Sequence, residues 1–171
     1  MKILVLGGNS QRHHEWIRQL KDALEPFGHE VVLHDYKHWE SGDPMADIEY
    51  EIGTVAQRMA DVTSYVIIAK SIGTVIAALG TARGRLSPSR IVMLGTPYEG
   101  IAGEIPEFLS SLEALPYAMF VQNQYDPYGS ADGLYKLLVD HSPVHYELTS
   151  VPDNTTHDYL DFTFINQLLT K

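Results

Sequence analysis

Ser71 lies where one apolar run ends and another begins at once. Residues 65–69 are rich in β-branched side chains and predict a buried parallel strand, and residues 72–79 predict a packed helix. A serine on a sharp turn between strand and helix is exposed for nucleophilic attack, and such a turn needs small residues two positions to either side. Ala69 and Gly73 meet that need. The pattern indicates a nucleophile elbow; the alternative is a serine that only caps the helix.

Two other residues with useful proton chemistry follow later apolar runs. Asp126 comes just after residues 117–122, and His157 lies in the polar segment that follows residues 144–148. The carboxyl ends of parallel strands meet at one edge of a sheet, and sites form beyond that edge. Serine, acid and histidine therefore occur in that order along the chain, each after its own predicted strand.

Both later residues also have structural explanations. Asp126 precedes a proline, and an Asp-Pro pair commonly opens a turn, although the proline also holds the preceding residue extended. His157 could be an exposed residue at the start of a helix. If Asp126 only shapes a turn, the next candidate acid is Asp153, in the loop that leads to His157. His141 and His145 are poorer candidate bases, because they precede or enter the last strand.

The first predicted strand ends in a short polar turn, Gly7-Gly8-Asn9-Ser10. This string matches neither G-x-G-x-x-G nor the P-loop pattern, so phosphate binding is not predicted. The glycine pair could form a tight turn with no other role. His13 and His14 follow it and are placed to line the mouth of a pocket, whereas Trp16 is expected to pack in the core.

Other polar side chains carry weaker signals. His34 and His38 have a spacing that occurs in metal sites, with Asp35 between them. Side chains of a suitable type do not by themselves establish the geometry that a metal ion needs, so no metal site is predicted. Lys70 precedes the candidate nucleophile and is expected to be solvated or salt-bridged, with no role assigned to it.

Composition limits the possible function classes. The chain has 171 residues, 44% of them apolar, and no cysteine, which fits a single domain over residues 1–171 without disulfides or zinc–thiolate sites. A net charge of −10 disfavours nucleic acid and anionic membranes as partners. No apolar run is long enough to span a bilayer, and residues 1–8 fit a buried first strand better than a signal peptide. We expect a cytoplasmic protein.

Strands and helices alternate along the chain. The predicted strands cover residues 2–6, 30–34, 65–69, 90–94, 117–122 and 144–148. The predicted helices cover residues 14–27, 45–60, 72–84, 106–112, 130–139 and 158–169, with residues 36–44 as a loop. Repeated β-α units predict an α/β fold with three layers: a mainly parallel six-stranded sheet with helices on both faces.

The chain resembles the α/β-hydrolase family over nearly its whole length, on the elbow at Ser71 and on the chain order serine, acid, histidine. It looks like a minimal member without a separate lid domain. The resemblance implies Ser71 as nucleophile, Asp126 as the triad acid and His157 as general base. It also implies backbone N–H donors for an oxyanion from Ile72 and from the turn after the first strand. In that turn, Asn9 and Ser10 are both candidates.

Two features depart from the family pattern. Ala69 stands where the elbow usually has its first glycine, and Gly7-Gly8 replaces the His-Gly pair common in the oxyanion loop. The chemistry remains sound, since imidazole can take the serine proton near neutral pH and a carboxylate can hold the ring in the required tautomer. Preset N–H donors would stabilise the oxyanion.

The sequence therefore predicts a serine hydrolase that cleaves a small-molecule carboxylic ester or thioester through an acyl-enzyme, with no cofactor and no metal. Residues 95–116 supply one short helix and no sealed tunnel, so we expect an open, small pocket that favours short acyl groups. Two alternatives stay open: a nucleotide- or flavin-binding doubly wound domain, and a catalytically silent binding protein on the same scaffold. The oligomeric state is open as well.

Overall fold

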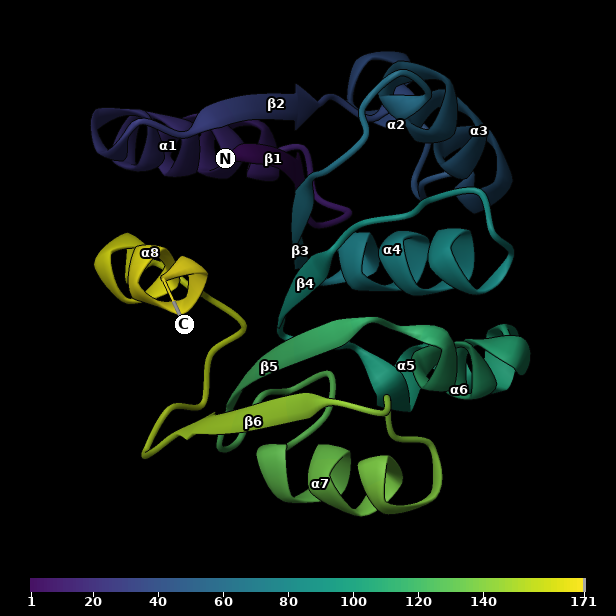
Figure 1. Ribbon diagram of the computed structural model, residues 1–171. Helices are drawn as coiled ribbons and strands as arrows, with labels where there is room; N and C mark the ends of the chain where they lie inside the picture. Colours follow the sequence, from purple (N-terminus) through teal and green to yellow (C-terminus); the bar gives the residue numbers. More distant parts are fainter. Residues whose placement is uncertain (171) are drawn as a thin grey trace.

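The computed structural model describes residues 1–170 as a six-stranded sheet with helices on both faces (Figure 1). All neighbouring strands are parallel, in the order β2-β1-β3-β4-β5-β6. Their bounds are β1 (Lys2–Leu6), β2 (Glu30–His34), β3 (Val66–Lys70), β4 (Arg90–Leu94), β5 (Tyr117–Asn123) and β6 (Tyr146–Val151). The α/β fold class with its three layers is confirmed.

Helices cover the two faces of the sheet unequally (Figure 1). One face carries α1 (His13–Leu24) and α8 (Phe162–Leu169), which pack against each other. The other carries α3 (Ile48–Met59), α4 (Ile72–Ala82), α6 (Glu107–Ser111) and α7 (Ala131–Asp140). Shorter turns are α2 (Lys37–Ser41), α5 (Tyr98–Glu104) and the 3₁₀ segments Glu25–Phe27 and Leu112–Ala114. Within residues 1–170, no helix is both long and apolar enough to cross a bilayer.

The centre of the sheet is the part that matters most for a site. All five residues of β3 are buried between β1 and β4, and α4 is buried from Ile72 to Gly80. Both elements are apolar nearly throughout, as expected for a central parallel strand and the helix that covers it. After β2 the chain crosses over β1 to form β3, so the direction of winding reverses between β1 and β3. Sites in open sheets form beyond the strand ends at such a point.

Most predicted elements are confirmed with small shifts. The predicted bounds of β1, β2 and β4 match those observed. The last strand starts two residues later than predicted, at Tyr146, and α8 starts at Phe162 because the Asp161 carboxylate caps it by accepting a hydrogen bond from Phe164 N. Residues 36–44 include the helix α2 rather than loop alone, and residues 95–116 contain α5 and α6 rather than one short helix.

Candidate active site

Ser71 forms the turn between β3 and α4 in a conformation that L-residues rarely adopt. Its φ is 53° and its ψ is −123°. Ser71 N donates a hydrogen bond to Leu94 O at 3.0 Å, and Ser71 O accepts one from Thr74 N at 2.8 Å. The side chain makes no capping hydrogen bond, although Ser71 occupies the N-cap position of α4. A strained backbone that its surroundings hold in place is typical of a functional turn, and it leaves the hydroxyl free to face a pocket.

The residues that flank Ser71 explain how strand and helix can lie so close. A Cβ added at Gly73 would lie 2.7 Å from Leu6 O and 2.8 Å from Gly7 O, so α4 touches the end of β1 backbone to backbone. Glycine is therefore required at this position. Ala69 lies fully buried inside β3, opposite Leu6 and Met93, where the strand accommodates its methyl group.

Asp126 and His157 form a buried pair. His157 Nδ1 lies 2.7 Å from Asp126 Oδ2 and 2.9 Å from Asp126 Oδ1. The Tyr128 N–H donates a further hydrogen bond to Asp126 Oδ1 at 2.9 Å. The carboxylate is the acceptor, so His157 carries its proton on Nδ1 and leaves Nε2 as the free basic nitrogen. Asp153, the alternative acid, is exposed and does not bind the ring.

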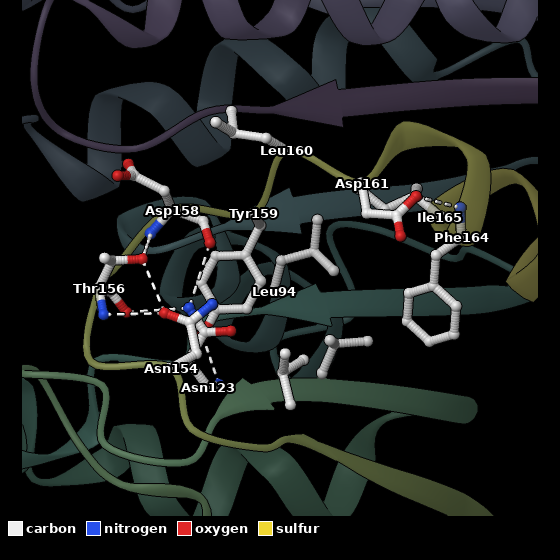
Figure 2. A pocket seen from close by; sticks show the side chains of 12 residues that line it. Leu94, Asn123, Asn154, Thr156, Asp158, Tyr159, Leu160, Asp161, Phe164 and Ile165 are labelled. Carbon is white, nitrogen blue, oxygen red and sulfur yellow. Dashed lines mark hydrogen bonds between the residues drawn. The ribbon is translucent and has the colours of Figure 1, made fainter.

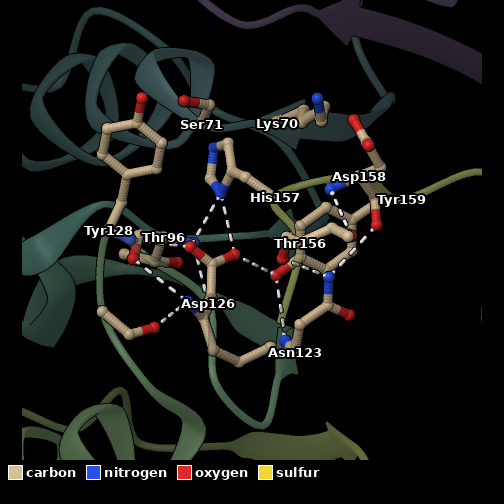
Figure 3. A network of polar contacts seen from close by, with 12 residues as sticks. Lys70, Ser71, Thr96, Asn123, Asp126, Tyr128, Thr156, His157, Asp158 and Tyr159 are labelled. Carbon is tan, nitrogen blue, oxygen red and sulfur yellow. Dashed lines mark hydrogen bonds and ion pairs between the residues drawn. The ribbon is translucent and has the colours of Figure 1, made fainter. Parts of the chain in front are cut away.

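The His157 ring lies between the Asp126 carboxylate and Ser71 (Figure 3). It packs on Tyr128, with ring centroids 4.7 Å apart, and edge-on to Tyr159 at 6.0 Å. His157 Nε2 is buried and has no hydrogen-bond partner within residues 1–170. A buried basic nitrogen without a partner needs an explanation, and a reacting group placed between it and Ser71 would supply one.

A cavity of about 350 Å³ opens at Ser71 and His157. Asn9, Ser10 and Ile72 also line it, so all three predicted oxyanion residues lie around the same space. Ile72 is the first residue of α4, where backbone N–H groups have no acceptor within the helix. The cavity is thus lined by the segments that follow β1, β3 and β6, and Asp126, from the loop after β5, binds His157.

The turn after β1 is held by a segment that the sequence did not mark as functional. Asn9 O accepts hydrogen bonds from His38 Nε2 at 2.6 Å and from Trp39 Nε1 at 3.1 Å. Tyr36 Oη donates to Gly7 O at 2.9 Å. These aromatic side chains come from α2 and the residue before it, and they fix the backbone of the turn. In the sequence, this role could have been suggested only by the aromatic and histidine residues that gather in the predicted loop, residues 36–44.

His34, at the end of β2, and His38, in α2, each have a polar partner from another part of the chain. His34 Nε2 lies 2.7 Å from Glu51 Oε2, with both side chains buried, and His38 binds the backbone of Asn9. Across residues 1–170, no group of three His, Cys, Asp or Glu side chains is arranged to hold a metal ion.

Lys70 is buried, which corrects the expectation of a solvated or salt-bridged side chain. Only 1% of its surface is exposed, because this last side chain of β3 contacts His13 and the Trp16 ring of α1. Its Nζ lies 2.5 Å from His13 Nε2, and His13 is buried too. Burial, and next the charge of Lys70, lower the pKa of His13 to about 4. Burial also lowers the pKa of Lys70 to about 8, against the opposing charge of Asp158.

Tyr159 is a second feature that the sequence did not single out. Its hydroxyl donates to Asp126 Oδ2 at 2.8 Å and accepts from Asn123 N at 3.0 Å. Burial raises the pKa of Tyr159 well above its usual value, so the phenol stays protonated as a donor. Asn123 Nδ2 also donates to Thr156 O at 2.9 Å, which ties the loop carrying His157 to the end of β5. Trp16 packs in the core, as expected.

A larger cavity of about 420 Å³ lies on the other side of Tyr159, between the ends of β4 and β5 and the start of α8 (Figure 2). Its walls are mostly apolar, from residues such as Leu94, Val121 and Ile165, and it contains neither Ser71 nor His157. The smaller cavity is therefore the candidate site, because Ser71 and His157, the predicted nucleophile and base, both line it.

This chain resembles known proteins in its three-dimensional structure. No family model matches the chain, and no curated protein matches it. An uncharacterized protein from Bacillus cereus ATCC 10987 superposes on this chain with a TM-score of 0.74 at 15% sequence identity. The match covers 99% of this chain and 58% of that protein. The chain thus spans a little over half of that protein.

Two further proteins of similar fold are one solved with a bound ligand and one thioesterase. Est1E from Butyrivibrio proteoclasticus, solved with ferulic acid bound, has a TM-score of 0.71 at 12% identity over 98% of this chain and 86% of its own. RedJ, a thioesterase from the prodiginine biosynthetic pathway in Streptomyces coelicolor, has a TM-score of 0.68 at 13% identity over 99% of this chain and 85% of its own. At these identities the likeness establishes a shared fold.

Proposed function

We propose that this protein is a serine hydrolase acting on a carboxylic ester or thioester. The proposal is supported by its α/β-hydrolase fold, by the cavity that Ser71 and His157 line, and by the contact of Asp126 with His157. The observation that carries the proposal is the His157 ring. Its Nδ1 is held by Asp126, and its buried Nε2 has no partner within the described chain and lies on the Ser71 side (Figure 3).

In the proposed reaction, Ser71 Oγ attacks the substrate carbonyl carbon while His157 Nε2 takes the hydroxyl proton. The Asp126 carboxylate stabilises the imidazolium that forms. The oxyanion accepts hydrogen bonds from the backbone N–H of Ile72 and of Asn9 or Ser10.

Collapse of the tetrahedral intermediate breaks the bond to the alcohol or thiol, which leaves with the proton from His157. Water then attacks the acyl-enzyme, with His157 again as base. Breaking the bond to Ser71 Oγ releases the carboxylic acid and returns the proton to Ser71.

The class of substrate is supported by the cavity and by the neighbours. Pro97, Ile101 and Tyr128 give the cavity apolar walls suited to an acyl chain, and its volume of about 350 Å³ suits a small one. Esterases and a thioesterase are among the proteins of the same fold, and one of them binds an aromatic carboxylic acid. Ester and thioester therefore remain the two acyl donors we propose.

A fluorophosphonate probe tests the proposal, because it reacts only with an activated serine. We expect labelling of the wild-type protein and hydrolysis of p-nitrophenyl butyrate, both abolished by Ser71→Ala with little change in thermal stability. Ser64→Ala is the matched control, since Ser64 is exposed and precedes β3, at the end of that strand opposite to Ser71. A wild-type protein that is neither labelled nor active would favour a silent binding protein.

A further inference from the structure

Lys70 has no part in the chemistry proposed so far, yet its environment is unusual. It immediately precedes Ser71 and is almost fully buried. Transferring an ammonium group out of water is costly unless the group is paired and hydrogen-bonded. Its hydrogen-bond partner is a neutral ring, His13 Nε2, rather than a carboxylate, and its Nζ lies 5.7 Å from the Trp16 ring centroid. A protein core retains such a group only where other contacts compensate the cost.

The contacts at its two ring nitrogens determine which nitrogen of His13 carries the proton. An ammonium can only donate, so His13 Nε2 must accept and Nδ1 must bear the hydrogen. His13 Nδ1 lies 3.1 Å from Ser10 O, and the His13 backbone N donates to the same oxygen at 2.9 Å. A chain of hydrogen bonds thus runs from Lys70 through His13 to the carbonyl of Ser10.

The His13 ring also packs directly on the turn that Ser10 belongs to. A Cβ added at Gly8 would lie 2.5 Å from Cε1 of the His13 ring, so the ring rests against the backbone there. Asn9 and Ser10, the candidate oxyanion donors, line the cavity with Ser71. Oxyanion donors act only when held in place before the reaction, and a displacement of about 1 Å can lower the rate by about 100-fold.

We infer that Lys70 is a positioning residue that acts through His13 to hold the oxyanion turn at Asn9 and Ser10. The inference rests on the proposed function, because the turn matters for rate only if Ser71 forms an oxyanion. His38 and Trp39 hold the Asn9 carbonyl from the α2 side, and Lys70 with His13 holds the Ser10 carbonyl from the α1 side.

The charge state of Lys70 gives the inference a pH signature. Burial lowers the pKa of Lys70 to about 8, so the ammonium loses its proton in an accessible range. A neutral amine still donates to His13 Nε2, but it no longer polarises the ring with a positive charge, so the hydrogen bond from His13 Nδ1–H to Ser10 O weakens. The titratable or charged groups around Lys70 are Arg12, His13 and Glu15 from the start of α1, Asp158 from the loop after β6, and Asp126 from the loop after β5.

Three single variants and one double variant separate a positioning role from general stability. Lys70→Met keeps the length and removes the charge. His13→Gln keeps an oxygen near Nε2 for Lys70 but loses the donor to Ser10 O, whereas His13→Asn keeps a donor near Nδ1. We expect Lys70→Met and His13→Gln to lower kcat on p-nitrophenyl butyrate by about 10- to 100-fold with little change in KM. His13→Asn should retain more activity, and the double variant Lys70→Met/His13→Gln should lose no more than either single one.

The pH profile completes the kinetic test. Wild-type kcat should fall with a midpoint near pH 8, and Lys70→Met should lack that fall. A Lys70→Met variant with wild-type kcat and pH profile overturns the inference. If Lys70→Met does not fold, the His13 variants decide: equal activity of His13→Gln and His13→Asn overturns it.

A nuclear magnetic resonance measurement separates this inference from the proposed function. The ¹⁵N shifts of His13 should show a proton on Nδ1, and the amides of Asn9 and Ser10 should move in Lys70→Met. If the wild-type protein proves inactive but these amides move, the positioning contact stands and the proposed function fails. Unmoved amides overturn the contact itself.

Discussion

The hydroxyl of Tyr159 donates a hydrogen bond to Asp126 Oδ2 over 2.8 Å, on the same oxygen that lies 2.7 Å from His157 Nδ1. Tyr159→Phe should therefore leave the carboxylate freer to rotate and misalign the His157 ring. A hydrogen bond to a charged group contributes about 1.5 kcal/mol or more, so we expect kcat to fall by about 10-fold. Steady-state hydrolysis of p-nitrophenyl butyrate measures this. Tyr135→Phe, at an exposed tyrosine of α7, is the control, and an equal effect of both would contradict the prediction.

Asp126→Asn should lower kcat far more than Tyr159→Phe does. The amide can donate to His157 Nδ1 and so favours the tautomer with the proton on the wrong nitrogen, with an expected loss in kcat on the order of 10⁴-fold. His157→Ala should lower kcat nearly as much as Ser71→Ala does. The double variant should lower it little further, because the members of a triad act as a unit. Asp153→Asn should hydrolyse esters normally, since Asp153 is exposed. Normal hydrolysis by Asp126→Asn would remove Asp126 from the triad.

Gly73→Ala tests the close contact between α4 and β1. Its Cβ would lie 2.7 Å from Leu6 O, a backbone atom that cannot move without shifting β1. We expect the free energy of unfolding to fall by about 1–3 kcal/mol, with loss of activity because Ser71 moves with the turn. Gly103→Ala in α5 meets no atom within 4 Å and should leave the free energy of unfolding unchanged or raised. Urea unfolding of both variants gives the comparison; equal stabilities would show that the elbow tolerates a methyl group.

Acyl-chain preference follows from the size of the cavity at Ser71. With a volume of about 350 Å³ and an open mouth, this cavity can bury little of a long acyl chain. Each added methylene should therefore improve the free energy of binding by less than the ~0.8 kcal/mol that full burial gives. The kcat/KM values for p-nitrophenyl esters should peak at short chains. Ile101→Ala should move the peak to longer chains, while Leu160→Ala, at the second cavity, should not. A steep rise through long-chain esters in the wild-type protein would reveal a deep apolar channel.

Local pattern was enough to predict the sheet and the turn at Ser71. The strands β1, β2 and β4 coincide with their predicted bounds, because a short apolar run between polar breaks has few ways to be buried. Ser71 stood out for the same reason, since a strand that turns at once into a packed helix forces a sharp junction.

Only the tertiary structure revealed what surrounds that junction. The helix α2 has five residues and no apolar periodicity to mark it, and the contacts of His38 and Trp39 with Asn9 join residues about thirty positions apart. The burial of Lys70 and the bond from Tyr159 to Asp126 depend likewise on which strand ends lie side by side. A single side chain looks the same in sequence whether it meets water or a partner from another strand. Strand order, which local pattern does not encode, decides between the two.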